Sequence, residues 1–600
     1  MNGQKKENLL NLSLDATEEE REKSPALRVG TDSEDRRWEV IVKYNGNLEP
    51  IQAAFPEMEA YPLSGGYAVI RTSESQIEPL AGFSQIEYME KPKRLYFSVD
   101  KGKSASCITR VQEGPRGLTG RGVITAVIDS GIDYFHEAFR DAAGKTRILE
   151  LWDQDRGIVY GESQINEALE TGSRAAAFEV VPSRDVSGHG TAVAGIAAGS
   201  GMMQGSGERG LGRNESRNRG IAYESRLLIV KLGTSLRDSF PRTTELMRAL
   251  DYVVRRSVDF EMPVAVNLSF GNTYGSHDGT SLVETYLDTI AAMGRTVVVA
   301  GTGNEGNSRG HTSGVLSNRG RVSGRPGRAG GAGNLERAGD TGTAEAELIV
   351  GGYETGFGVQ LWKQYVDRFS VELISPDGIS TGPISPVLGS QRITFRNTTV
   401  LLYYGMPSPY SKAQEIYFDF IPRQSYVESG VWKFRLIPEE IVSGIYDFWL
   451  PAEQVLNRET RFLYSTPDTT LTIPSTAARA ITVGAYDDSY QAYADFSGRG
   501  FNRLDQGIKP DLTAPGVNIV TARAGGGYEA MTGTSFAAPF VTGSAALMMQ
   551  WGIVDGNDPY LYGEKLKAYL LRGARPLPGE EVYPNPRLGY GTLCLDASFP

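Results

Sequence analysis

The chain has 600 residues, of which 40 % are hydrophobic and 22 % are charged, and its mean hydropathy is −0.29. This composition is typical of folded globular domains and excludes a disordered chain, a collagen-like repeat and a disulfide-stapled miniprotein. With 61 Lys and Arg against 72 Asp and Glu, the net charge is −11, so we expect neither nucleic acid nor membrane among the partners.

The cysteines and the N-terminus bear on the compartment. Cys107 and Cys594 are too few for a disulfide framework or a cysteine-rich zinc site, which suits a reducing or cysteine-indifferent compartment. The first residues include basic side chains, but no apolar stretch follows them, and the chain then turns acidic. We therefore expect no signal peptide, and a protein that is not exported or that leaves cells by an unconventional route.

The first hundred residues contain two kinds of sequence. Residues 1–35 are polar and charge-dense, which predicts a mobile arm or a short exposed helix. Over residues 36–97, strand-like alternation at 38–44 and 66–72 is interleaved with two candidate helices and closed by IEYMEKPKRLYF. This β-α-β-β-α-β order predicts a small ferredoxin-like domain.

Residues 98–315 alternate apolar strands with helices. VITAVIDSG, RLLIVKL, PVAVNLSFG and TVVVAGTGNEG are near-continuous apolar runs, and most of them end in glycine turns. Such runs predict a parallel α/β sheet covered by helices on both faces. The chemistry of these sheets collects at the carboxyl ends of the strands.

The sequence pattern changes twice in the next part of the chain. Residues 316–347 are rich in Gly and Arg without interleaved aromatic residues, which favours a loop or linker over a nucleic-acid tract. Residues 348–465 alternate as FSVEL, TVLLYYG and EIYFDFI do, which predicts an inserted β-sandwich of the jelly-roll kind. The α/β texture resumes over residues 466–600, so one α/β domain is interrupted by one β domain.

The chain has four histidines, at positions 136, 189, 277 and 311. His136 lacks the second histidine of a helical zinc site, so we expect no metal. His277 lies in a turn-like stretch and is expected to have no catalytic role. His189 directly precedes a run of small helix-forming residues, in SGHGTAVAGIAAG, and is the candidate for chemistry.

Two glycine-rich strings match other motifs but fail on context. GTGNEG (301–306) fits the dinucleotide fingerprint, yet NSRGHTSG follows it instead of a helix, and no acidic residue stands at the spacing that a ribose requires. GNSRG (306–310) fits the hydrolase nucleophile elbow, yet the only later histidine is His311. Neither string supports a cofactor, and we expect none.

Four residues remain with a coherent chemistry: Asp129, His189, Asn304 and Ser535. Asp129 ends a buried strand, where a hydrogen-bonded carboxylate can orient an imidazole. Ser535 precedes a helix-like run, so its hydroxyl would lie near the positive end of that helix. Asn304 follows a strand and can offer an amide N–H to a developing oxyanion.

The order Asp–His–Ser and the strings DSG, HGT, GNEG and GTSFAAP resemble those of the subtilisin-like serine proteases. The resemblance covers about residues 105–315 and 470–600, and VNLSFG, ADFSGRG and KPDLTAPG extend it. It implies a subtilisin-like sheet, an acyl-enzyme mechanism, and catalytic roles for the four residues above. By the same similarity, Ser269 and Gly271 would bind substrate backbone as an edge strand.

The resemblance implies further features of the site. Gly301 and Gly303 would form the opposite wall of the pocket for the residue before the cut, with Glu305 near its rim. In place of the Asp that often holds a structural calcium in the family stands Ala138, which makes calcium there doubtful. Phe540 replaces the histidine usual after GTSFAAP, without touching the expected mechanism.

Residues 36–97 resemble the inhibitory prodomain of the family, with a cut expected between Arg94 and Val99. Within the family, the chain is most similar to the clostridial Csp-type germination proteases, because it combines a prodomain, a β insert and no expected signal peptide. The prodomain of those proteases tends to stay bound. In spores those proteases activate a cortex-lytic hydrolase by limited cleavage. We therefore expect a cytoplasmic or spore-associated endopeptidase whose partners are a protein or peptide substrate and its own prodomain. The alternative is a regulatory or binding protein that keeps the fold with a permanently docked prodomain.

Overall fold

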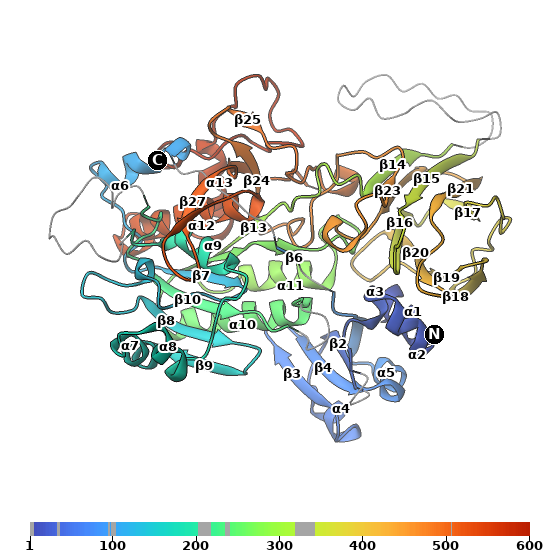
Figure 1. The fold of residues 1–600 in the computed structure, drawn as a ribbon, viewed down its shortest axis with the longest axis horizontal. Helices are drawn as coiled ribbons and strands as arrows, with labels where there is room; N and C mark the ends of the chain where they lie inside the picture. The colour runs from blue at the N-terminus through green and yellow to red at the C-terminus, as the bar shows by residue number, and fades with distance from the viewer. Residues whose placement is uncertain are drawn as a thin grey trace.

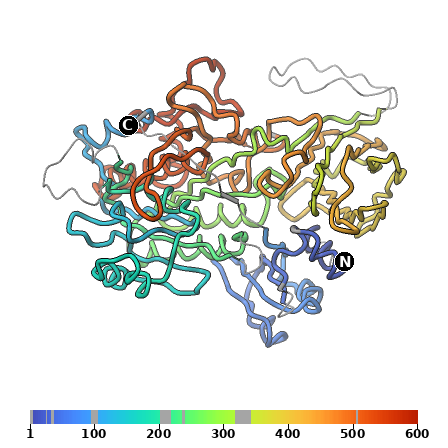
Figure 2. Tube along the Cα trace, in the orientation of Figure 1, coloured from blue at the N-terminus to red at the C-terminus, as the bar shows by residue number. Residues whose placement is uncertain are grey.

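The structure, a computed structural model, contains a large parallel sheet, a small N-terminal domain and a β-sandwich insert (Figure 1). It describes residues 5–32, 37–93, 96–97, 104–201, 218–234, 240–317, 342–505 and 507–600. Figure 2 shows the insert at the opposite end of the molecule from the C-terminus, with the N-terminus beside the insert.

The central sheet has the strand order β25-β24-β13-β11-β7-β10-β8-β9, with β26 beside β24. β9 and β25 pair antiparallel with their neighbours, and the other strands pair parallel. Their bounds are β7 Ile124–Asp129, β8 Ile148–Asp153, β9 Ile158–Gly161, β10 Arg226–Lys231, β11 Val264–Leu268, β13 Thr296–Gly301, β24 Ile481–Asp487, β25 Ala492–Tyr493 and β26 Leu512–Pro515. The central strands β7, β11 and β13 are buried along their whole length, which confirms the predicted doubly covered sheet.

Helices cover both faces of this sheet (Figure 1). α9 (His189–Ala198) and α12 (Thr534–Met549) pack together on one face, and α10 (Thr243–Asp259) and α11 (Leu282–Ala291) pack on the other. Further helices are α6 Ile108–Glu113, α7 Glu162–Glu170, α8 Arg174–Val180, α13 Gly563–Gly573 and α14 Leu595–Ser598. Thr534–Val554 is long and apolar enough to span a membrane, but its apolar window is 83 % buried inside the protein, as expected for a core helix.

The N-terminal domain, residues 5–93, contains an antiparallel sheet with the order β5-β2-β4-β3. Its elements are β1 Thr31–Asp32, β2 Arg37–Tyr44, α4 Glu49–Ala54, β3 Glu59–Leu63, β4 Tyr67–Ser73, α5 Glu74–Ala81 and β5 Ile86–Glu90. One face of the sheet packs on α4 and α5, and the other packs on α10 and α11 of the core. This order and the two helices confirm the ferredoxin-like prediction.

The prediction of an exposed arm over residues 1–35 is wrong for its first helix. α1 (Asn8–Asp15) buries Leu9 and Leu12 against Tyr403 and Tyr417 of the insert, and α2 (Glu18–Lys23) and α3 (Pro25–Arg28) follow it. The predicted exposure holds for α2, in which no residue is buried. Burial of these leucines between the two domains stabilises the otherwise polar segment in one position.

The insert consists of two antiparallel sheets, with the orders β14-β22-β16-β20-β19-β18 and β17-β21-β15-β23, that share one aromatic-rich core. Its strands are β14 His311–Val315, β15 Ala344–Val350, β16 Phe357–Gln364, β17 Arg368–Ile374, β18 Gly389–Thr394, β19 Thr398–Tyr404, β20 Ala413–Pro422, β21 Gly430–Glu440, β22 Ile445–Trp449 and β23 Arg461–Phe462. The predicted sandwich therefore begins earlier than residue 348, because β14 pairs with β22. Most of the predicted linker, residues 318–341, lies outside the described residues.

The two cysteines form a disulfide, Cys107–Cys594, across a sequence separation of 487 residues. It joins the residue that precedes α6 to the residue that precedes α14. Two cysteines are too few for a framework, as expected, but a single bridge between the beginning and the end of the core was not predicted.

Candidate active site

The predicted catalytic residues lie where neighbouring elements of the core end or begin. Asp129 is the last residue of β7, and His189 is the first residue of α9. Ser535 is the second residue of α12, and Asn304 follows β13. Because β13, β11 and β7 are neighbours in the sheet, their carboxyl ends gather these side chains at one edge.

Asp129 and His189 form a buried pair. Nδ1 of His189 and Oδ1 of Asp129 are 2.7 Å apart, and the two residues are 3 % and 0 % exposed. Gly190 allows α9 to approach this closely, since a Cβ there would lie 2.1 Å from the carbonyl oxygen of Gly131. The pair has the geometry in which a carboxylate fixes the orientation and tautomer of an imidazole.

A second carboxylate, which was not predicted from the sequence, shapes the loop before α9. Asp185 accepts hydrogen bonds from the backbone N–H of Gly188 and of Thr191, and from the hydroxyl of Ser130. Ser130 in turn accepts from the backbone N–H of Gly190 at 3.0 Å. The DSG string therefore connects the end of β7 to the start of α9. The signal for this role was the position of Ser130 directly after Asp129.

Ser535 is buried at the start of α12 and bonds to the residue after β11. Its hydroxyl donates to the carbonyl oxygen of Ser269 at 2.9 Å, and the Ser269 hydroxyl donates back to the Ser535 carbonyl oxygen at 2.8 Å. The ring of Phe536, the next residue, lies edge-to-face against His189 with centroids 5.3 Å apart. These contacts bring the hydroxyl, the imidazole and the predicted substrate strand into one neighbourhood.

The side-chain amide of Asn304 is held by the same helix. Its Oδ1 accepts from the backbone N–H of Thr534 at 3.2 Å and from the Thr534 hydroxyl at 3.1 Å. With Oδ1 engaged, the Nδ2 end of the amide is left for another acceptor. That is the arrangement an oxyanion donor requires.

One pocket contains most of the predicted site. It is lined by Ser269, Phe270, Gly271, Gly301, Gly303, Asn304, Glu305, Ala452, Gln454, Thr472, Thr534 and Ser535. Ala452 and Gln454 lie after β22 of the insert and were not predicted, since nothing in their local sequence indicates a substrate pocket. Burial raises the pKa of Glu305 to about 7, and this carboxylate accepts from the backbone N–H of Glu453. The expectation that Glu305 lies at this pocket agrees with the lining, although its side chain is buried.

The end of the N-terminal domain reaches this pocket. β6 (Tyr96–Phe97) pairs antiparallel with β12 (Phe270–Gly271), with Phe270 opposite Phe97 and Gly271 opposite Tyr96. β12 is the edge strand predicted to bind substrate backbone. Of the segment expected to be cut, only these two residues are described, and residues 94–95 and 98–99 lie outside the described part.

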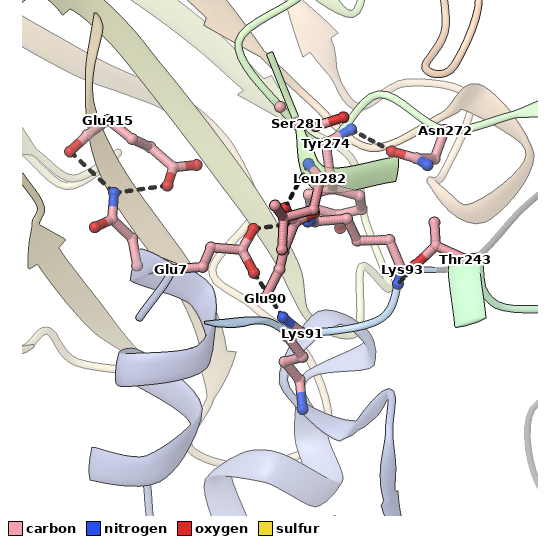
Figure 3. A network of polar contacts seen from close by, with 12 residues as sticks. Glu7, Glu90, Lys91, Lys93, Thr243, Asn272, Tyr274, Ser281, Leu282 and Glu415 are labelled. Carbon is pink, nitrogen blue, oxygen red and sulfur yellow. Dashed lines mark hydrogen bonds and ion pairs between the residues drawn. The ribbon is translucent and has the colours of Figure 1, made fainter. Parts of the chain in front are cut away.

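A buried polar network joins the N-terminal domain, the core and the insert (Figure 3). Lys93 forms ion pairs with Glu7, at 2.7 Å, and with Glu90. Oε2 of Glu90 also accepts from the backbone N–H of Leu282 on α11, at 2.9 Å. Burial would lower the pKa of Lys93, but the two carboxylates outweigh it and hold this pKa above its ordinary value.

The insert adds a third carboxylate to this network, since Glu415 of β20 accepts from the side-chain amide of Asn8 at 2.8 Å. Burial is the main cause that raises the pKa of Glu7 to about 7 and that of Glu415 to about 8. Three carboxyl groups therefore lie near one lysine. The network is one of several polar contacts that hold the N-terminal domain in place, among them the hydrogen bond from the Thr244 hydroxyl to Glu39.

Metal ligation is not indicated at the site. Among the residues that the structure describes, no group of three or more His, Cys, Asp or Glu side chains is arranged to hold a metal ion. His136, the candidate already set aside, is buried and its Nε2 lies 2.9 Å from the carbonyl oxygen of Gly527.

The fold and the site together define the class of protein. A family model described as the subtilase family matches residues 120–415 and 461–591, more than half of the chain, and the chain belongs to that family. A second model, described as the Csp protease B prodomain, matches residues 4–93. The N-terminal domain, α1 included, is therefore a prodomain of the Csp type.

Comparison with individual proteins narrows this class. The solved structure of the Clostridium perfringens CspB protease is 37 % identical, with a TM-score of 0.73, and the match covers 82 % of this chain and 95 % of that one. The serine protease AprX of Bacillus subtilis is 34 % identical over 157 residues, which are 23 % of this chain and 33 % of AprX. The minor extracellular protease Vpr of the same organism is 24 % identical over 500 residues, 79 % of this chain and 51 % of Vpr. The chain spans between a third and about half of the length of these two curated relatives. The predicted similarity to Csp-type proteases is confirmed by the prodomain model and by the CspB structure.

Proposed function

We propose that this chain is a serine endopeptidase that cuts its own prodomain and then activates a target protein by limited cleavage. Ser535 Oγ attacks the scissile carbonyl carbon, and its proton passes to His189, which Asp129 orients. The side-chain amide of Asn304 and the backbone N–H of Ser535 stabilise the oxyanion. His189 then protonates the leaving amine, and water hydrolyses the acyl-enzyme.

The observation that carries this proposal is the pairing of the prodomain tail with β12, a strand that lines the same pocket as Ser535. An antiparallel ladder advances by one residue on each strand. Tyr96 and Phe97 pair with Gly271 and Phe270, and the core residue directly before Phe270 is Ser269, whose carbonyl oxygen accepts from Ser535. We therefore propose that self-cleavage follows residue 98, within the interval predicted from the sequence.

Self-cleavage is tested by mass spectrometry of the chain purified from a protease-deficient host. The unmodified chain is expected to separate into two fragments, the larger beginning at Val99, whereas Ser535→Ala is expected to keep its full 65.2 kDa. Ser544→Ala is the matched control, because Ser544 is also a buried serine of α12 and lies outside the pocket. Identical clipping of the Ser535→Ala chain would refute self-processing.

A second candidate function is a regulatory or binding protein whose prodomain never leaves. The buried network of Glu7, Glu90, Glu415 and Lys93 favours it, since such a network holds the prodomain against both the core and the insert. Labelling with a fluorophosphonate separates the two candidates. Full labelling of the processed protein at Ser535 would exclude this alternative, and absence of labelling would support it.

A further inference from the structure

One polar side chain on the outer face of the insert is buried without facing the sandwich core. In β16, Phe357, Val359 and Leu361 point into that core, so alternation directs Gln360 outward. An outward residue of a sandwich ordinarily meets solvent, yet Gln360 is only 2 % exposed. The loop of the core that follows β12 covers it.

Both ends of the Gln360 amide are used by this loop. Its Nε2 donates to the carbonyl oxygen of Thr273 at 3.0 Å, and its Oε1 accepts from the backbone N–H of Gly275 at 2.8 Å. The Thr273 oxygen also lies 3.1 Å from Nε2 of His277, and Gly275 is half-buried. Loss of a partner from these backbone groups is costly to the extent that water cannot replace it. The amide therefore fixes the loop in two places at once.

Neighbouring contacts hold the same loop against the insert. The hydroxyl of Thr273 donates to the carbonyl oxygen of Leu450 at 2.8 Å. The ring of His277 stacks on that of Trp449, at a centroid distance of 4.3 Å and an interplanar angle of 12°. The insert thus holds the loop from its start to its end.

The loop is joined to the substrate strand by a single residue. Asn272 stands between Gly271 of β12 and Thr273, and it exchanges backbone hydrogen bonds with Ile473 of the segment that returns from the insert. A displacement of Thr273 is therefore passed to β12 through one residue, Asn272. Small displacements of a substrate-binding group have large effects on catalysis.

We infer that Gln360 is a positioning residue of the substrate site, acting through the loop at residues 273–275 to hold β12 in register for an extended peptide. This inference rests on the proposed endopeptidase function. It assigns a role in the reaction to the insert, which otherwise contributes Ala452 and Gln454 to the pocket. Peptide residues that pair with β12 depend on Gln360, and the residue bound in the pocket itself depends on it much less.

The test compares two ester substrates that end in the same amino acid, a single acylated residue and a tetrapeptide. Only the tetrapeptide pairs with β12, and a docked prodomain tail competes with both, so its effect cancels in the ratio of the two kcat/KM values. Gln360→Leu is expected to lower this ratio about fivefold to tenfold, the effect of about one lost hydrogen bond, with the loss mainly in KM. The single-residue ester should keep its kcat/KM within about twofold.

Gln414→Leu is the matched control. Gln414 is also a buried glutamine of the insert, but its amide donates to the carbonyl oxygen of Gly405 inside the insert. It should leave the ratio unchanged even where the melting temperature falls as far as in Gln360→Leu. An equal fall of the ratio in both variants, or no fall in Gln360→Leu, would overturn the inference.

Gln360→Glu supplies a rescue that keeps the fold of the site. When protonated, the carboxyl group that this variant introduces can still donate to the Thr273 oxygen and accept from Gly275, whereas the carboxylate has no proton to donate. The ratio is expected to approach that of the unmodified protein in acid and to fall as the pH rises, with the pH dependence of the triad common to both esters. A ratio independent of pH would count against the inference. Failure of the proposed function is distinct, since the unmodified chain would then hydrolyse neither ester faster than Ser535→Ala does.

Discussion

Retention of the prodomain after cleavage is expected to weaken as the pH rises, and Glu415 provides the clearest test. This carboxyl lies in the insert, receives a hydrogen bond from Asn8 of the prodomain, and has a pKa raised from the ordinary 4.5 to about 8. Burial is the main cause, and the nearby Glu7 adds to it while Lys93 opposes it. Release of the prodomain opens this site to water and returns the pKa toward its ordinary value.

The sign follows from the direction of the change. Docking binds a proton at Glu415, so this contribution to docking is complete below pH 4.5 and is lost as the pH rises to about 8. The full difference corresponds to about 5 kcal/mol, an upper limit because part of the site stays covered after release. Between about pH 6 and pH 8 the dissociation constant of the prodomain is expected to rise by up to about 50-fold from this group alone. Glu7, whose pKa is raised to about 7, acts in the same direction.

The assay captures self-processed protein through a tag on the prodomain and measures how fast the mature chain elutes from pH 5.5 to 8.5. Glu415→Gln keeps an acceptor for Asn8 and removes the titration, so elution in alkaline buffer should slow and the pH dependence should shrink. Glu440→Gln is the control, since Glu440 is an exposed residue of the same insert, in a surface ion pair with Arg368. Elution that is equally fast at every pH, or a pH profile that Glu415→Gln leaves unchanged, would refute the reasoning.

Two further predictions concern the site and the stability of the core. Gly271→Ala would place a Cβ 2.4 Å from Oγ1 of Thr472, so β12 must shift, and self-cleavage should slow by more than about tenfold in a time course on denaturing gels; an unchanged rate would show that β12 does not guide the tail. Cys107→Ser removes the disulfide to Cys594 and should lower the free energy of unfolding of the mature chain by about 2–5 kcal/mol, measured in denaturant. A midpoint unaffected by this change, or by added reductant in the unmodified protein, would contradict it.

The sequence predicted those parts of the structure whose signals are local. Asp129 and Ser535 were identifiable because Asp129 ends a run of apolar strand residues and Ser535 begins a run of apolar helix residues. A parallel sheet then brings residues at such positions together at the carboxyl ends of its strands. The face that each strand of the prodomain buries was readable for the same reason, since alternation along β2 separates Val40 and Val42 from Ile41.

The features that were not predicted all depend on contacts between distant residues. The leucines of α1 are buried by tyrosines of the insert, and the sequence near Leu9 or Leu12 does not indicate those partners. Gln454 reaches the pocket only because the insert returns to the core beside it. Local sequence predicts which elements form, whereas the surface that a helix or loop meets is decided by the packing of the whole chain.

The place where the insert leaves and rejoins the core has a consequence for experiments that shorten this chain. Glu305 precedes the departure and Thr472 follows the return, and both line the cleft that holds Ser535. A shortened chain without the sandwich would lose Ala452 and Gln454 from the wall of this cleft, so its inactivity would not show that the sandwich has any role apart from the cleft. The sandwich is therefore a structural part of the cleft and not a separable appendage.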